Sequence, residues 1–167
     1  MRGISLLLGV CGAIAALLAW QVTAPLIPAD PAASSMAVRL GKASAALLPG
    51  VAVLATMLLA QMAGRFATAA FDPLGGRETR FLQVNQRVIS NTVEQLAVFA
   101  PALLALAAGA PAARLPEVLA LGIVFALARL LFWGGYLAAT VARAPGMAAS
   151  LVTTLATLLA AAWNWMQ

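Results

Sequence analysis

Four polar side chains lie at helical spacing in a stretch that is otherwise apolar enough to cross a bilayer. Gln83, Arg87, Asn91 and Glu94 stand at i, i+4, i+8 and i+11, so they share one face of a helix. Placing an ionised carboxylate inside a membrane span is unfavourable, and such residues are commonly paired and functional. We therefore predict that this face binds a partner or a ligand.

A second polar line is predicted on the next apolar segment. Arg129, Trp133, Tyr136, Thr140 and Arg143 are separated by 4, 3, 4 and 3 residues, which also predicts one helix face. If the segment stays helical, this line runs from the middle of the membrane to its cytoplasmic end.

The two lines allow two interpretations. In the first, Arg129 pairs with Glu94 inside the bundle, and the pair only holds the helices together. In the second, the helices bind an anionic guest, because more cations gather at one membrane face than one carboxylate requires. The residues expected at that face are Arg65, Arg80, Arg87, Arg143, Asn91 and Tyr136.

The composition predicts an integral membrane protein. Of 167 residues, 63% are hydrophobic and only 9% are charged, against roughly 25% charged residues in soluble domains. The net charge of +5 is scattered, so no basic run predicts nucleic-acid binding. There is no histidine and one cysteine, Cys11, which argues against zinc sites, Ser-His or Cys-His catalysis and an internal disulfide.

Five apolar segments are long enough to span a bilayer as helices. They are Ile4–Val22, Ala43–Ala63, Leu82–Ala108, Pro116–Val141 and Met147–Trp165. Short turns around prolines join the last three, which predicts antiparallel neighbours. The predicted fold is an all-α integral membrane four-helix bundle over 43–167, preceded by an additional N-terminal transmembrane helix at 1–22 and a loop at 23–42.

The distribution of basic residues predicts the orientation of the spans. With the N-terminus inside, five spans place the larger set of basic residues on the cytoplasmic side and leave the C-terminus outside. The cytoplasmic set is Arg2, Arg65, Arg77, Arg80, Arg87 and Arg143, and the outer set is Arg39, Lys42 and Arg114. Segment 1–22 also has features of a signal peptide, but its long apolar run favours a retained helix.

Both polar lines are similar to those of one membrane-protein family. The run Arg87-x3-Asn91-x2-Glu94 with Phe99 and Pro101, and then Ala128-Arg129-Leu130 with Tyr136 and Arg143, resembles the MAPEG family (membrane-associated proteins in eicosanoid and glutathione metabolism). The resemblance covers 43–167. It implies a left-handed four-helix bundle, a homotrimer, and glutathione bound between adjacent subunits near the cytoplasmic side.

The resemblance also implies roles for individual residues. By position, Arg87, Asn91 and Glu94 would hold the glutathione backbone, and Arg65 would reach its carboxylate end. Tyr136 would contact the tripeptide, and Arg143 would lie at the thiol. Gln83, Gln95 and Arg129 are interpreted as structural residues or as supports for this set.

The chain departs from the family pattern in three places. Gln95 and Phe132 stand where glutathione-using members often have tyrosines, so two hydroxyl contacts are missing, and the N-terminal helix is additional. We predict a bacterial inner-membrane enzyme that uses glutathione as a co-substrate and no metal. Its reaction is expected to be that of a transferase or peroxidase acting on hydrophobic electrophiles. The alternatives are a non-catalytic lipid-binding or assembly protein and, less favoured, a small transporter.

Overall fold

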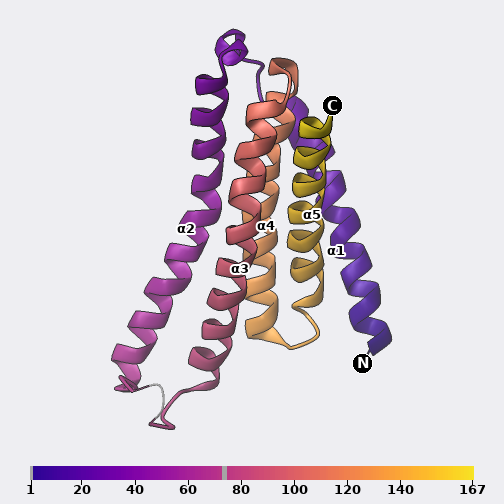
Figure 1. Cartoon of the computed structure of the whole chain (residues 1–167). Coiled ribbons are helices and arrows are strands. Elements are labelled where there is room, and N and C mark those ends of the chain that lie inside the picture. Colours follow the sequence, from indigo (N-terminus) through magenta and orange to yellow (C-terminus); the bar gives the residue numbers. More distant parts are fainter. Residues whose placement is uncertain (1, 73–74) are drawn as a thin grey trace.

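Residues 2–72 and 75–167 are described in the computed structural model, and they form five long helices (Figure 1). The helices are α1 (Arg2–Thr23), α2 (Met36–Thr68), α3 (Arg80–Gly109), α4 (Leu115–Ala138) and α5 (Ala144–Met166). Each is long and apolar enough to cross a membrane. The chain is thus a multi-pass membrane protein.

The five predicted spans are all present, but several boundaries differ, most of all those of α2, which extends beyond its predicted segment at both ends. Helix α2 begins at Met36, so the end of the predicted loop 23–42 is helical, and the remainder contains the short helices η1 (Ala24–Leu26) and η2 (Pro31–Ser34). Helix α4 ends at Ala138 rather than at Val141. Its next residue, Ala139, is extended, with φ of −157° and ψ of 150°.

The helices run up and down in an antiparallel array (Figure 1). Helices α3 and α4 contact each other and lie between α2 and α5, while α1 packs against α5 and α4. This arrangement confirms the predicted all-α membrane bundle of four helices with an additional N-terminal helix. The N-terminus, the α2–α3 connection and the α4–α5 turn lie at one end, and the C-terminus lies at the other.

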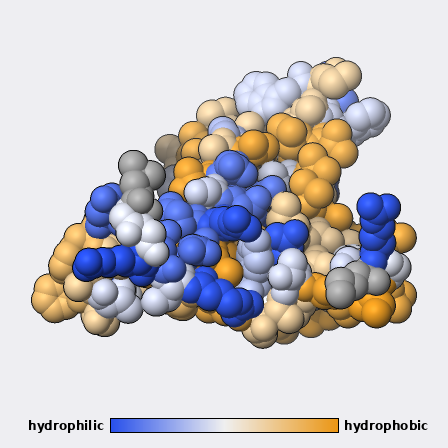
Figure 2. Space-filling view, turned by 90° about the horizontal axis from the view of Figure 1, so that it is seen from below, coloured by the Kyte–Doolittle hydropathy of each residue, from blue (hydrophilic) through white to orange (hydrophobic). Residues whose placement is uncertain are grey.

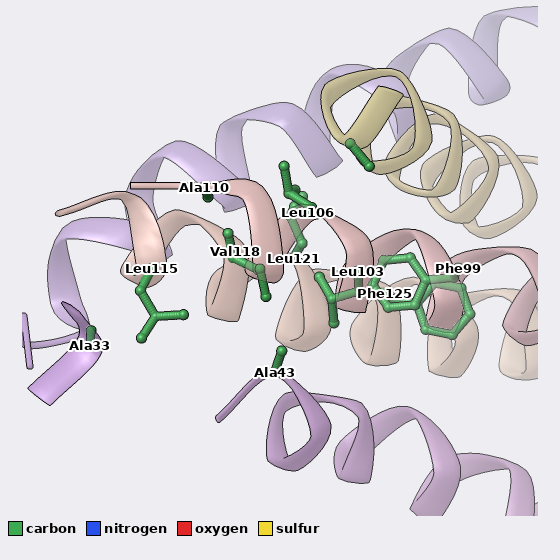
Figure 3. Packing of buried hydrophobic residues seen from close by; sticks show 12 residues of the cluster. Ala33, Ala43, Phe99, Leu103, Leu106, Ala110, Leu115, Val118, Leu121 and Phe125 are labelled. Carbon is green, nitrogen blue, oxygen red and sulfur yellow. The ribbon is translucent and has the colours of Figure 1, made fainter. Parts of the chain in front are cut away.

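The bundle is held by apolar packing and by close approach of helix backbones. Phe99 of α3 and Phe125 of α4 are stacked with ring centroids 4.3 Å apart, within a buried cluster that Figure 3 shows. At Gly122, a Cβ atom would lie only 2.2 Å from the carbonyl oxygen of Ala46. Since small residues let membrane helices approach closely, Gly122 determines how α2 packs on α4.

Arg39 ties the α1–α2 connection to the end of α3. Its guanidinium donates hydrogen bonds to the carbonyl oxygens of Ala33, Ser34, Ala107 and Ala108. The last two carbonyls belong to the final turn of α3, where helical partners run out and a cation is favoured. The sequence analysis placed Arg39 only among the basic residues on the outer side of the membrane, whereas in the structure its side chain caps the C-terminal end of α3.

Candidate functional site

A groove of about 1100 Å³ lies at the end of the bundle that carries the N-terminus. Four of the predicted ligand-binding or catalytic residues line it: Arg87 and Asn91 from α3, Tyr136 from α4, and Arg143 from the α4–α5 turn. The rest of the lining comes from α1, α4, α5 and the turn, and most of it is apolar. One concave surface therefore joins cationic and apolar side chains.

Tyr136 is the point at which the two polar lines meet. Its side chain is buried, and the guanidinium carbon of Arg143 lies 4.6 Å from the centre of its ring. Arg87 of α3 lines the same groove, and its charge acts on the Tyr136 hydroxyl together with that of Arg143. The phenol is thus held between two guanidinium groups, which brings two positive charges to one place without a neutralising carboxylate among the described lining residues.

The route by which Arg143 reaches this place differs from the prediction. We expected Thr140 and Arg143 to continue the α4 face, but both lie in the turn after the helix has ended. The turn folds back against α4 at Gly135. A Cβ atom at this position would lie 2.2 Å from the carbonyl oxygen of Ala142, so the absence of a side chain allows the close approach. Pro145 stands in the first turn of α5, where its fixed φ and missing N–H are tolerated, so a new helix starts here.

Arg129 does not pair with Glu94, so the ion-pair interpretation was wrong. The side chain is fully buried and donates to Thr92 Oγ1 at 2.9 Å, Ser150 Oγ at 3.0 Å and Asn91 Oδ1 at 3.1 Å. Its guanidinium carbon also lies 4.3 Å from the centre of the Phe132 ring. Neutral acceptors and an aromatic face thus satisfy this cation. Its hydrogen bond to Asn91 also orients the side chain of a groove residue.

Glu94 lies near the middle of α3 on the exposed surface of the chain. Within the described residues, three ion pairs occur, Lys42 with Asp30, Arg65 with Glu78 and Arg114 with Glu117, and none includes Glu94. Glu94 also does not line the groove. A single chain therefore leaves a carboxylate on a membrane-spanning surface.

Arg65 lies outside the groove of its own chain, on the last turns of α2. Its Nη2 atom is 3.1 Å from Glu78 Oε1 in the connection to α3. Its Nε atom is buried and has no hydrogen-bond partner among the described residues. Within one chain, Arg65 is therefore not among the residues that line the groove with Arg87 and Arg143.

The two glutamines are also outside the groove. Gln83 is exposed and donates to the carbonyl oxygen of Glu78 at 3.3 Å. Gln95 accepts a hydrogen bond from Thr154 Oγ1 at 3.0 Å, which joins α3 to α5. Gln95 therefore stabilises the contact between α3 and α5.

A buried polar network behind the groove was missed by the sequence analysis. Asn85 accepts a hydrogen bond from Trp133 Nε1 at 2.7 Å and donates to Gln61 Oε1 at 2.9 Å and to the carbonyl of Met57. Asn85 and Thr92 are seven residues apart on α3 and both fully buried, so their spacing was the available signal. This second polar face of α3 joins α2 to α4.

Charged residues are concentrated at the same end of the molecule as the groove. Seen from this end, Figure 2 shows hydrophilic side chains gathered toward the middle of the face, with hydrophobic side chains around its margin. Arg2, Arg65, Arg77, Arg80 and Arg143 belong to segments at this end. Such a surface attracts anions from the aqueous side.

A sequence model of the MAPEG family matches residues 43–163, which is well over half of the chain. The matched region includes α3, α4 and the α4–α5 turn, and so every groove residue predicted from the two polar lines. Helix α1 lies outside the match. No curated protein matches the chain.

Proposed function

The chain belongs to the MAPEG family, and from that premise we propose that it is a glutathione-dependent transferase or peroxidase acting on lipophilic electrophiles. Family membership supports a membrane protein associated with glutathione at the coarse level. The observation that carries the finer proposal is the groove in which Arg87, Asn91, Tyr136 and Arg143 come together beside apolar side chains. Such a groove suits an anionic peptide thiol and a membrane-dissolved second substrate.

The proposed residue roles follow from charge and position. Arg87 and Asn91 hold the glutathione backbone, Tyr136 contacts the tripeptide, and Arg143 stabilises the thiolate. An unperturbed thiol with a pKa of about 8.5 is mostly protonated at neutral pH, and a neighbouring guanidinium favours its anion. Arginine is suited to this role because it stays protonated.

The reaction needs no nucleophile from the protein. In the transferase reaction, the thiol proton leaves to water, the thiolate forms a carbon–sulfur bond with the electrophile, and the leaving group departs with its bonding electrons. In the peroxidase reaction, two glutathione thiols are oxidised to one disulfide while a hydroperoxide is reduced to an alcohol and water. The groove contributes by bringing an aqueous and a lipophilic reactant together.

The exposed position of Glu94 supports a homotrimer with glutathione held between adjacent subunits. A carboxylate in the middle of a lipid-facing surface is unfavourable, so a neighbouring copy that covers it stabilises the assembly. The neighbour's Arg65, which has an unsatisfied buried Nε, would then approach the Arg87 to Glu94 face. In mild detergent, we expect a trimer by native mass spectrometry, and a stable monomer that still binds glutathione would contradict this arrangement.

We predict that Glu94→Gln leaves the helices folded but weakens glutathione binding about tenfold. The amide keeps hydrogen-bonding capacity and loses the charge that would meet the ligand's ammonium group or orient Arg87. Titration calorimetry on the purified trimer measures the Kd, and circular dichroism checks the fold. Glu117→Gln, which makes the same change at a partly exposed residue outside the groove, is the matched control. A trimer lost in Glu94→Gln with an unchanged Kd would assign Glu94 to assembly alone.

We propose that the protein lies in a bacterial inner membrane with its N-terminus and the α2–α3 connection in the cytoplasm. The reason is that the basic residues at the groove end outnumber those at the other end, where Arg39, Lys42 and Arg114 lie. Reporter fusions should place Gln167 in the periplasm. A cytoplasmic Gln167 would reverse the orientation and place the groove away from cytosolic glutathione.

Glutathione titration into the purified protein is the direct test of the proposed function. Saturable binding together with conjugation of a nitroaromatic electrophile would support the enzyme. The second candidate is a non-catalytic lipid-binding or assembly protein. It is favoured by Gln95 and Phe132, which lack the hydroxyl groups of the tyrosines common in glutathione-using members, and Gln95 is bonded to Thr154 within the chain. Absence of both thiolate absorbance and conjugation would select this candidate.

A further inference from the structure

Helix α1, which lies outside the family match, is anchored to the bundle by its second half. A Cβ atom at Gly12 would lie 2.2 Å from the carbonyl oxygen of Pro145, so the backbones of α1 and α5 touch there. Ala16 is buried, and Trp20 Nε1 donates a hydrogen bond of 2.9 Å to the carbonyl oxygen of Glu117 in α4. From Gly12 onward, α1 is thus held against both α4 and α5.

The first half of α1 is not packed on any side. None of residues 2–10 is buried, although four consecutive residues cover all sides of a helix. Figure 1 shows the N-terminal end of α1 standing apart from the lower end of α5. A helical segment with so few buried contacts is free to move relative to the bundle. We call residues 2–10 the free half of α1.

Two glycines lie where the free half meets the anchored half. A glycine inside a helix costs about 1 kcal/mol relative to alanine, and glycine is one of the residues at which helices bend. At Gly9, a Cβ atom would lie 3.7 Å from the Cβ atom of Ala148, which is an ordinary contact. Gly12, in contrast, is fixed by its contact with Pro145. The junction is therefore weak as a helix but secured at one end.

The groove has one arginine on the free half and two on the bundle. Arg2 lines it from α1, Arg87 from α3 and Arg143 from the α4–α5 turn, and no carboxylate lies among the described lining residues. Like charges around one concave surface repel one another and raise its positive potential. Without a bound anion, this repulsion pushes the free half away from the bundle. A bound anion reverses the effect, because each arginine then meets a negative charge.

We propose that the free half of α1 is a gate that bends at Gly9 and Gly12 and closes over the groove when an anion binds there. In the closed state, Arg2 contacts the anion from the side opposite Arg87 and Arg143. This proposal rests on the proposed function, since glutathione is the anion, and deepens it by giving the additional helix control of access. Closure shields the bound thiol from water, whereas the open state leaves a side entrance to the groove.

Spin labels measure the position of the gate directly. They are attached at Leu7→Cys on the free half and at Ala138→Cys at the end of α4, both exposed and outside the groove lining. The exposed native Cys11 is replaced by alanine, and an excess of unlabelled chains ensures that double electron–electron resonance reads distances within one chain. Glutathione sulfonate keeps both carboxylates of glutathione and cannot react as a thiol. It should shorten the distance by more than about 2 Å, the scale of a hinge rearrangement.

Arg2→Gln should abolish this response at a saturating concentration of the analogue, because the gate then has no charge to meet the anion. Arg77→Gln is the matched control. It removes the same charge at an exposed residue of the same end that does not line the groove, so it should keep the full shift. Calorimetry measures binding of the analogue to each variant. A bound analogue that leaves the parent distance unchanged, or a response of Arg2→Gln as large as that of the parent, would overturn the gate.

A pair of glycine substitutions tests the hinge without any ligand. Gly9→Ala adds a methyl group for which there is room and stiffens the junction, so it should narrow the distribution of label distances. Gly3→Ala adds the same group beyond the hinge, with no atom within 4 Å, and should leave the distribution as in the parent. If calorimetry shows that neither glutathione nor its sulfonate binds, the proposed function fails, but these widths still report on the hinge. Equal widths for Gly9→Ala and the parent would overturn the hinge.

Discussion

Replacing Arg143 with alanine is expected to lower kcat for glutathione conjugation about 100-fold, the usual effect of removing one preorganised charge from a reacting centre. Arg143 is placed above the Tyr136 ring by the α4–α5 turn, beside Arg87, in a groove without described carboxylates. A guanidinium there stabilises the thiolate more than the neutral thiol. The loss should therefore appear as lower thiolate absorbance in the ultraviolet as well as slower turnover.

Arg87→Ala is the informative comparison for this variant. It removes the proposed contact to the glutathione backbone, which would be similar in the ground state and the transition state, so it should chiefly raise the glutathione KM. Stopped-flow absorbance and steady-state rates with a nitroaromatic electrophile measure both variants and the parent. If Arg143→Ala keeps the thiolate signal and the rate of the parent, the catalytic role of Arg143 is rejected.

Gly122→Ala is expected to cost about 3 kcal/mol of folding free energy and to lower Tm by roughly 10 °C. The added Cβ would stand 2.2 Å from the carbonyl oxygen of Ala46, and this atom belongs to the α2 backbone rather than to a flexible side chain. The two helices must move apart, which also disturbs the stacked pair Phe99 and Phe125. Thermal unfolding followed by circular dichroism in detergent measures the change.

Gly41→Ala is the matched control, because it adds the same methyl group to a helix interior with no atom within 4 Å. There, alanine should stabilise α2 by roughly 0.5–1 kcal/mol through its higher helix propensity. Opposite signs for the two substitutions would separate the contact from the propensity. Equal Tm values for Gly122→Ala and the parent would show that α2 and α4 are not in backbone contact.

The buried side of α3 gives the proposed site its rigidity. Arg129 donates a hydrogen bond to Asn91, and Asn85 is hydrogen-bonded to both Gln61 of α2 and Trp133 of α4. These hydrogen bonds fix the rotation of the helices that carry the groove residues. In a low-dielectric interior, an unsatisfied donor or acceptor costs free energy, so other rotations are disfavoured. This network connects the packing of the fold to the geometry proposed for glutathione.

Local sequence patterns were enough to predict the class of the protein and most of its helices. A bilayer requires about 20 consecutive apolar residues per helix and satisfied backbone groups, so composition and length were enough to predict five spans. Helical spacing placed Arg87 and Asn91 on one face, and the resemblance to the family, confirmed by the match over residues 43–163, came from the same local pattern. Each of these features depends on neighbours close in sequence.

The pairing of helix faces could be seen only in the folded chain. The sequence allowed an ion pair between Arg129 and Glu94. In the structure, α3 is rotated so that Glu94 is exposed, and Arg129 donates hydrogen bonds to Thr92, Ser150 and Asn91 instead. Arg143 comes to Tyr136 through a turn rather than along a helix, and α1 becomes a groove wall through its contact at Gly12. Periodicity fixes the angle of a residue around its own helix, but the rotation and contacts between helices come from packing, which no single segment encodes.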